Sequence, residues 1–119
     1  MAEIIELNRK KRFTLQEAQV LLPIVKKITQ AAAEEVERLK RKAEGEETES
    51  ELQSLVEEKI ERITAGWAQK IIKLGCEPKG LWLVDFDNGG GYYCWHFPED
   101  NVAFYHTYND GFQKRTPIL

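Results

Sequence analysis

The 119-residue chain has no apolar run that approaches the roughly 20 residues required to cross a membrane. No apolar run follows the charges near its beginning, so we expect no signal peptide. It has 17 Lys and Arg residues against 20 Asp and Glu residues, and so lacks the basic excess of a general nucleic-acid-binding protein. These absences predict a cytoplasmic protein that binds neither membranes nor nucleic acid.

Cysteine is scarce, and the two that are present, Cys76 and Cys94, match no zinc or redox spacing. We therefore expect two reduced thiols. The glycine run at residues 89–91 has no following Gly-Lys-Ser/Thr and opens no helix, which excludes a phosphate-binding loop and predicts a flexible hairpin loop. The sequence contains no complete nucleophile–base set or metal-ligand set, so it leaves any reaction unnamed and the cofactor unknown.

The length predicts a single domain over residues 1–119. Its first part, residues 14–74, is expected to form a long antiparallel helical hairpin. Thr14 and Glu17 have the spacing of a capping box, with Phe13 placed as a hydrophobic staple. Pro23 predicts a kink or a restart of the first helix. Apolar residues then recur at helical spacing at Ala18, Leu21, Leu22, Val25, Ile28, Ala32, Val36 and Leu39.

Residues 44–50 are polar and predict a break between two helices, with Gly45 as the C-cap and Thr48 or Ser50 as the next N-cap. The second helix is expected over residues 51–74, and Gly75 ends it. Near-heptad spacing on both helices favours packing like that of a coiled coil, with a charged tip in solvent or against another subunit. The apolar face of the second helix is Leu52, Leu55, Val56, Ile60, Ile63, Trp67 and Ile71.

The pattern changes to alternation after Gly80, which predicts a three-stranded antiparallel meander over residues 81–108 packed on the hairpin, an α+β fold. A two-residue turn at Asn88-Gly89 places Asp85 opposite Tyr92, and pairing of Phe97 with Val102 places Cys94 opposite Tyr105. The expected core face is Trp82, Val84, Phe86, Tyr93, Trp95, Phe97, Val102, Phe104 and His106. The other face is Leu81, Leu83, Asp85, Tyr92, Cys94, His96, Ala103, Tyr105 and Thr107.

That second face is also fairly apolar, so the tail, a second subunit or a ligand must cover it. We expect a homodimer. In the tail, residues 109–119, a turn at residues 109–111 lets Phe112 fold back onto the sheet, and Pro117 is expected to end the ordered structure.

Several of these elements together resemble the prokaryotic family catalogued as domain of unknown function 2203. The resemblance covers nearly the whole chain and implies a small prokaryotic cytoplasmic protein, with no established reaction. Its residues are Phe13 to Ala18, Leu21-Leu22-Pro23, Leu83-Val84-Asp85-Phe86, Cys94-Trp95, Glu99, His106, Gly111-Phe112 and Arg115. His96 and Pro98 depart from the family pattern, so a site that used His96 would not be a family site.

Four polar residues lie in these motifs: Asp85, Glu99, His106 and Arg115. They predict a site for a small polar or anionic ligand, with Arg115 as a bidentate anion clamp. The structural alternative is an Asp–Arg pair that fixes the tail, with Glu99 capping a turn. His106 has two interpretations as well, a general base or a structural histidine with both ring nitrogens hydrogen-bonded.

Cys94 and His96 are two residues apart on a strand and share a face, which with Asp85 suggests a transition-metal site. His106 joins them only if the strand register shifts by one residue. Three functions thus remain open. In order, they are a non-enzymatic assembly module that homodimerises, a ligand-binding domain, and a metal-dependent enzyme that uses Cys94, His96 and His106.

Overall fold

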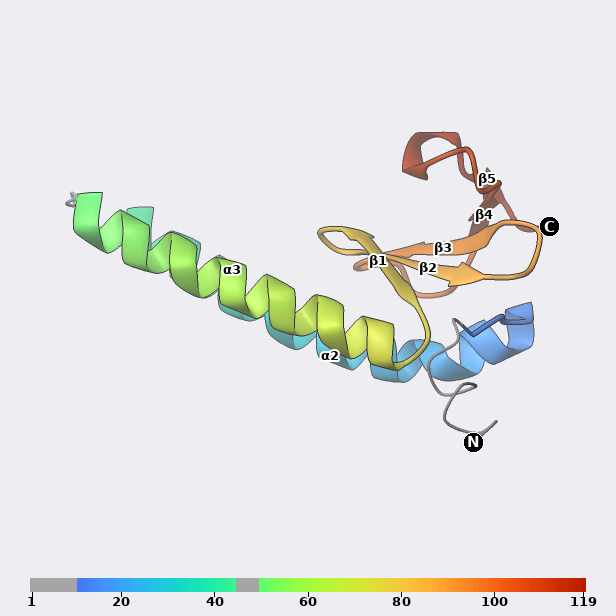
Figure 1. Ribbon diagram of the computed structural model, residues 1–119, viewed down its shortest axis with the longest axis horizontal. Coiled ribbons are helices and arrows are strands. Elements are labelled where there is room, and N and C mark those ends of the chain that lie inside the picture. Colours follow the sequence, from blue (N-terminus) through green and yellow to red (C-terminus); the bar gives the residue numbers. More distant parts are fainter. Residues whose placement is uncertain (1–10, 45–49) are drawn as a thin grey trace, which may run out of the picture.

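The computed structural model describes residues 11–44 and 50–119, and shows two helices packed against an antiparallel sheet (Figure 1). The α+β prediction is confirmed, but the sheet has five strands, in the order β1-β2-β3-β4-β5, where three were predicted. The helices are α2 (Leu15–Glu44) and α3 (Ser50–Lys73). The strands are β1 (Glu77–Gly80), β2 (Leu83–Asp87), β3 (Tyr92–His96), β4 (Phe104–His106) and β5 (Thr116–Pro117), with a 3-10 turn, η1 (Phe112–Lys114), before β5.

The predicted capping box begins α2. The Thr14 amide donates to Glu17 Oε1 (2.9 Å), and the Glu17 amide donates to Thr14 Oγ1 (3.1 Å). Phe13 is buried, its ring meets Phe86 edge-on at 5.4 Å, and its amide donates to the Asp87 carbonyl (2.7 Å). The start of α2 is therefore tied to the end of β2 by both backbone and side chain.

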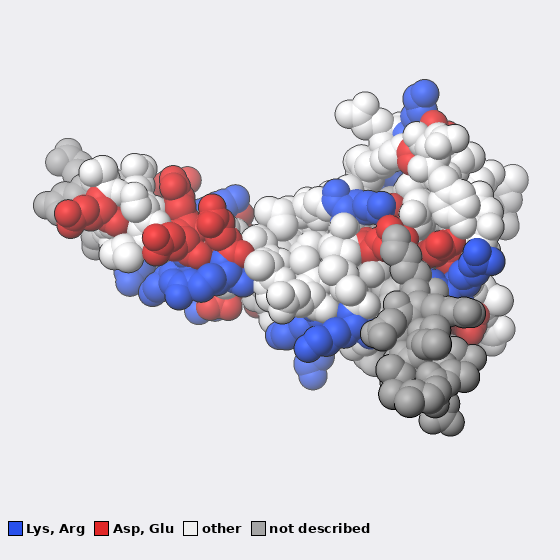
Figure 2. Space-filling model, viewed as in Figure 1, with Lys and Arg blue, Asp and Glu red and all other residues white. Residues whose placement is uncertain are grey.

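The two helices lie side by side as a packed pair, and α2 runs without a break through Pro23, so the predicted restart there is wrong (Figure 1). Trp67 of α3 donates its indole N–H to the buried hydroxyl of Thr29 on α2 (2.9 Å). The predicted caps at Gly45 and Thr48 lie outside the described residues. Charged side chains gather where α2 ends and α3 begins, at the end of the pair farthest from the sheet (Figure 2). In the described part of the chain, neither helix is long and apolar enough to span a membrane.

The core lies between the helical pair and one face of the sheet. Seven of the nine residues predicted for this face belong to the core or pack against it. Trp82, beside β2, meets Trp67 of α3 edge-on at 5.0 Å. The most buried large side chains of this layer are Val25, Ile71, Val84, Phe86 and Trp95.

Both strands that the sequence did not predict are edge strands that contain proline, Pro78 in β1 and Pro117 in β5. Proline cannot donate to a sheet ladder and is tolerated at an edge, where one side of the strand needs no partner. The expectation that Pro117 ends the ordered structure is wrong. Pro117 pairs with Phe104, and the next amide, of Ile118, donates to the Ala103 carbonyl (2.8 Å).

The predicted register is wrong at both hairpins. The loop between β2 and β3 has four residues rather than two, so Asp87 lies opposite Tyr92 and Asp85 lies opposite Cys94. This shift of two residues leaves each side chain on its predicted face. Between β3 and β4 the shift is one residue, because His106 lies opposite Tyr92. A shift of one reverses the faces of β4, and it moves Phe104 and His106 from the predicted core face to the face of Asp85 and Cys94.

The tail covers part of that second face, as one of the three predicted alternatives required. The guanidinium carbon of Arg115 lies 4.0 Å from the centre of the Phe104 ring and 4.3 Å from that of Phe112. Phe112 also contacts His96. Phe112 thus folds back towards the sheet, as predicted, but it remains partly exposed.

Candidate functional site

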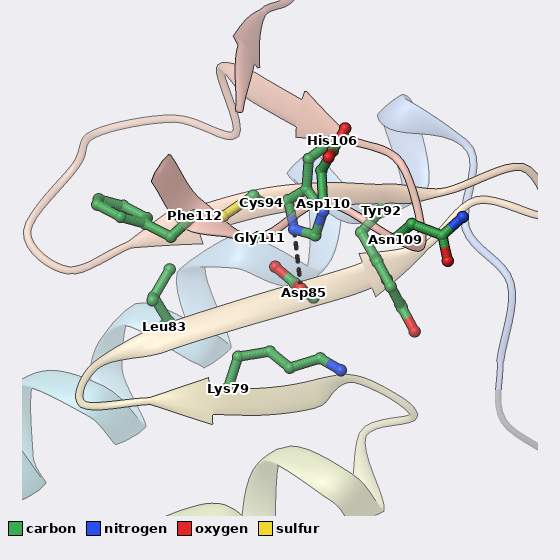
Figure 3. A pocket seen from close by; sticks show the side chains of 10 residues that line it. All are labelled: Lys79, Leu83, Asp85, Tyr92, Cys94, His106, Asn109, Asp110, Gly111 and Phe112. Carbon is green, nitrogen blue, oxygen red and sulfur yellow. Dashed lines mark hydrogen bonds and ion pairs between the residues drawn. The ribbon is translucent and has the colours of Figure 1, made fainter. Parts of the chain in front are cut away.

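Three neighbouring strands bring Asp85, Cys94 and His106 together on the second face of the sheet. Asp85 on β2 and Cys94 on β3 form a direct cross-strand pair. His106 on β4 lies two residues beyond Phe104, which faces Cys94, so it is the diagonal neighbour of Cys94. All three side chains are buried, and their ligand-type atoms lie within 4.8 Å of one another. Figure 3 shows His106 and Asp85 facing each other, with Cys94 on the strand between them.

The hydrogen bonds of His106 fix the number of protons on the pair. Its Nδ1 lies 2.8 Å from the carbonyl oxygen of Thr107, which can only accept, so Nδ1 carries a proton. Its Nε2 lies 3.0 Å from Asp85 Oδ2. One further proton lies between these two atoms, either on an imidazolium facing a carboxylate or on a carboxylic acid facing a neutral ring. In both arrangements the pair carries no net charge.

The second oxygen of Asp85 differs from the first. Oδ1 is buried, and no group in residues 11–44 or 50–119 makes a hydrogen bond to it. Burial raises the pKa of Asp85, and the nearby His106 and Cys94 side chains oppose that shift. A buried acceptor without a donor costs about 1–3 kcal/mol, so this oxygen is the least satisfied atom of the site.

Asp85, Cys94 and His106 also line a pocket with a volume of 340 Å³ (Figure 3). Lys79 of β1 is on one side of the pocket, and its amino group lies 5.0 Å from the centre of the Tyr92 ring and 3.2 Å from Glu77 Oε1. The remaining lining comes from Leu83, Tyr92 and the segment after β4, residues 109–112. The pocket is therefore a hollow over the sheet, with charged and aromatic walls and the Asp85–His106 pair in its floor.

The other two predicted ligand residues, Glu99 and Arg115, form a separate closed pair. Arg115 donates to both carboxylate oxygens, at 2.9 Å to Oε1 and 2.5 Å to Oε2, and the His96 amide also donates to Oε1 (2.8 Å). Partial burial acts to raise the pKa of Glu99, but the hydrogen bonds from Arg115 and His96 outweigh it and lower the pKa. We call Glu99 and Arg115 the tail clamp. The predicted Asp–Arg pair is wrong, because Arg115 binds Glu99 instead.

Cys94 lies between the two pairs. Burial and the adjacent Asp85 carboxylate raise the pKa of the Cys94 thiol to about 12, and Arg115 partly opposes them. With no metal bound, the side chain is a neutral thiol at physiological pH, which excludes a free nucleophilic thiolate.

His96 does not join the site, although it shares a face with Cys94. Its ring lies against Phe112, with 5.1 Å between the ring centres, and its amide belongs to the turn that Glu99 closes. The histidine beside Asp85 and Cys94 is His106, whereas the sequence suggested His96 for this position. Both nitrogens of His106 are hydrogen-bonded, as the structural interpretation of that residue required.

The loop between β2 and β3 supports the site and is ordered by its own hydrogen bonds. The amide of Asn88 donates to the Gly91 carbonyl (2.9 Å), and Gly89 has a positive φ of 94°. A Cβ on Gly91 would lie 2.6 Å from the carbonyl oxygen of His106. The close contact explains the glycine at position 91 and fixes β4, with His106, against the loop. The predicted hairpin loop is confirmed, and its backbone has a defined turn geometry.

Residues 11–118 match the model of a family described as uncharacterized conserved protein (DUF2203). The chain belongs to this family. The resemblance seen in the sequence is thereby confirmed. The DUF2203 match spans both helices and all five strands. No curated protein and no solved structure matches the chain, so the DUF2203 site must be interpreted from its own geometry.

Sequence reasoning missed Lys79, Tyr92 and Asp110 as lining residues of the DUF2203 pocket. Lys79 was missed because Pro78 and Gly80 hide the edge strand that carries it. Asp110 lies within the predicted turn at residues 109–111, but the sequence does not show that this turn folds over the sheet. Tyr92 was placed on the correct face without a role.

Proposed function

We propose that this domain binds a small polar molecule in the pocket above Asp85 and His106. The observation that carries the proposal is the buried Oδ1 of Asp85, an acceptor without a donor in a surface hollow. Nearly all buried polar atoms are hydrogen-bonded, so an exception calls for an explanation, and a bound ion, water or ligand is one such explanation. A ligand that donates to Oδ1 would remove the cost of leaving it unpaired.

The walls of the pocket indicate which chemistry suits it. Its 340 Å³ are at the small end of the range for ligand pockets, about 300–1,000 Å³. Lys79 supplies a positive charge for an anionic group; its side chain is 42% exposed, and a ligand carboxylate would compete with Glu77 for its amino group. A small amino acid or hydroxy acid carries both the donor for Asp85 and the carboxylate for Lys79.

In this proposal the four predicted ligand residues have two different roles. Asp85 and His106 contact the ligand, whereas Glu99 and Arg115 hold the tail that shapes one side of the pocket. Arg115 makes two hydrogen bonds to Glu99 and lies between two aromatic rings, so it has little capacity left to clamp an anion.

The test is a titration of the ¹⁵N-labelled protein with a panel of small amino acids and hydroxy acids, followed by amide chemical shifts. We expect saturable shifts confined to the pocket strands and residues 109–112, and a loss of them in Asp85→Asn. Lys79→Ala should weaken binding of the carboxylate ligands, and Lys73→Ala, an exposed lysine on α3, is its matched control. Shifts that spread along α2, or equal effects of both lysine variants, would contradict the proposal.

An assembly role is the second candidate, and a different surface favours it. Val20 and Ile24 on α2 are 73% and 51% exposed and line a shallow hollow next to Phe13. Exposed apolar clusters of this kind are typical of subunit contacts. We propose homodimer formation through this face of α2, with coiled-coil packing between the helices. Light scattering during size-exclusion chromatography tests it: the mass should be that of a dimer, and Val20→Glu should halve it, whereas Gln30→Glu, exposed on the same helix, should not.

A further inference from the structure

We propose that Asp85, Cys94 and His106 bind a Zn²⁺ ion, or another transition-metal ion with the same ligand preference, at the floor of the pocket. The inference rests on the proposed function in that both use the buried carboxylate of Asp85. It extends that function by naming a first occupant of the pocket.

The sheet itself sets the spacing of the three ligands. Asp85 and Cys94 are held opposite each other by β2 and β3, and His106 is one diagonal step away on β4. Their ligand atoms lie within 4.8 Å of one another before any ion is considered. Zinc bonds of about 2.0–2.3 Å need ligand atoms roughly 3–4 Å apart, so small side-chain rotations close the site.

The ligand types select the metal. A thiolate, an imidazole nitrogen and a carboxylate oxygen are the three donors that zinc sites in proteins use. A thiolate disfavours Mg²⁺ and Ca²⁺, which prefer oxygen donors alone. Three protein ligands leave one tetrahedral position for a water or a ligand atom, as in catalytic zinc sites. All three residues line the pocket, so this fourth donor would come from the pocket.

The outer contacts of His106 already have the arrangement of a metal-binding histidine. Its Nδ1–H donates to the Thr107 carbonyl (2.8 Å), which leaves Nε2 on the side of Asp85 and Cys94. Such a bond to a carbonyl fixes the ring and selects Nε2 as the ligand atom. The Oδ1 atom of Asp85, buried and without a donor, supplies a further lone pair.

A divalent ion is compatible with the charge balance of this site. Without metal, the thiol is neutral and the Asp85–His106 pair has no net charge. Binding of M²⁺ releases two protons, one from the Cys94 sulfur and one shared by Nε2 and Oδ2, and leaves a thiolate, a carboxylate and a neutral ring. The two negative charges match the ion, so the site stays neutral next to the Arg115 and Lys79 cations. A metal makes a coordinating thiol lose its proton outright, even when its apo form is fully protonated.

The experiment is a titration of the full-length, EDTA-treated protein with Co²⁺, followed by absorbance. We expect one equivalent of Co²⁺ to produce the visible bands of a tetrahedral site and a near-ultraviolet thiolate-to-metal band, and Zn²⁺ to abolish both. Cys94→Ser should remove the thiolate band, and Asp85→Asn should weaken the apparent affinity by more than about tenfold. Mg²⁺ and Ca²⁺ at the same concentration should not compete.

The chain offers a matched control for two of the ligands. Cys76 is the other buried free thiol and lies outside the cluster, and His96 is the other histidine. Cys76→Ser and His96→Asn should therefore leave the Co²⁺ spectrum unchanged. If either control lost as much as its partner variant, or if the wild-type spectrum lacked the thiolate band, the proposal would be overturned. Circular dichroism of each variant excludes unfolding, and the conservative Asp85→Asn decides if Cys94→Ser does not fold.

The two proposals fail separately. Amide shifts with amino or hydroxy acids but no Co²⁺ band would leave the ligand pocket and overturn the metal site. A cobalt site without any organic ligand would do the reverse.

Discussion

The Asp85–His106 pair and the Glu99–Arg115 pair flank the same thiol, Cys94. They differ in how many of their carboxylate oxygens are hydrogen-bonded. Both oxygens of Glu99 accept hydrogen bonds, one of them from two donors. Only one oxygen of Asp85, Oδ2, has a hydrogen-bond partner in the described residues, although Asp85 is the more deeply buried of the two. The less buried carboxylate is thus the satisfied one, which is the opposite of what stability alone would favour.

This difference indicates a structural role for the Glu99–Arg115 pair and a binding role for Asp85. A satisfied pair has no capacity for a further partner, and in the tail clamp it attaches β5 and η1 to the sheet. An unsatisfied buried oxygen costs free energy in the folded protein, and proteins keep such costs mainly at functional sites. The contrast predicts that loss of the clamp lowers stability and spares binding, and that loss of the Asp85 carboxylate does the reverse.

The largest effect on stability should come from Arg115→Ala. It leaves the Glu99 carboxylate without two hydrogen bonds and opens the stack between Phe104 and Phe112, which together should lower the free energy of unfolding by about 2–3 kcal/mol. Urea denaturation of the EDTA-treated protein measures this. Co²⁺ affinity should fall less than in Asp85→Asn, because Arg115 is not a ligand and acts on the site only through the Cys94 thiol.

The neighbouring Lys114 is the matched control. Its side chain is 76% exposed, and its amino group lies 4.0 Å from Asp110 Oδ1, so Lys114→Ala should change the free energy of unfolding by less than about 0.5 kcal/mol. Equal effects of the two variants would mean that the tail clamp stabilises the fold no more than an exposed ion pair does.

Asp85→Asn should have a smaller effect on stability despite its deeper burial. An asparagine side chain can donate to Nε2 of a neutral His106, and it removes a buried carboxylate that has one unpaired oxygen. We expect the free energy of unfolding to change by at most about 1 kcal/mol, in either direction, while Co²⁺ affinity falls. Urea denaturation and the cobalt titration on the same sample give both quantities. A loss above about 2 kcal/mol with intact Co²⁺ affinity would make this pair a second structural clamp.

Most of the framework of this comparison was predictable from sequence, because it depends on local rules. The capping box at Thr14 and Glu17, the helical faces and the core side of β2 and β3 follow from spacing within a few residues. The two edge strands were not predictable in this way, because proline and glycine are poor strand residues and only the neighbouring strand makes β1 and β5 pair.

The site depended on a single register. Asn88-Gly89 is a strong signal for a two-residue turn, but the four-residue loop is selected by Gly91 packing against the backbone of His106, a contact made across the sheet. The shift of one residue between β3 and β4 then brings His106 to Asp85 and Cys94. The sequence analysis required this one-residue shift for His106 to join the site, but only the packing of the whole sheet determines the register.

The smallest expected effect is a pH dependence specific to the tail clamp. The pKa of Glu99 is lower in the folded protein than its ordinary value of 4.5, so its ionised form stabilises the fold. That contribution is fully present above pH 4.5 and is lost as the pH falls from 4.5 through the folded pKa.

Glu99→Gln cannot ionise, so below pH 4.5 its free energy of unfolding should fall less steeply than that of the wild type. In the Arg115→Ala background the two slopes should converge, because the main cause of the lowered pKa is gone, and urea denaturation of the four proteins between neutral and acidic pH measures this. A slope difference that persisted without Arg115 would place the acid sensitivity of Glu99 outside the clamp, and would leave the two pairs closer in character than their hydrogen bonds indicate.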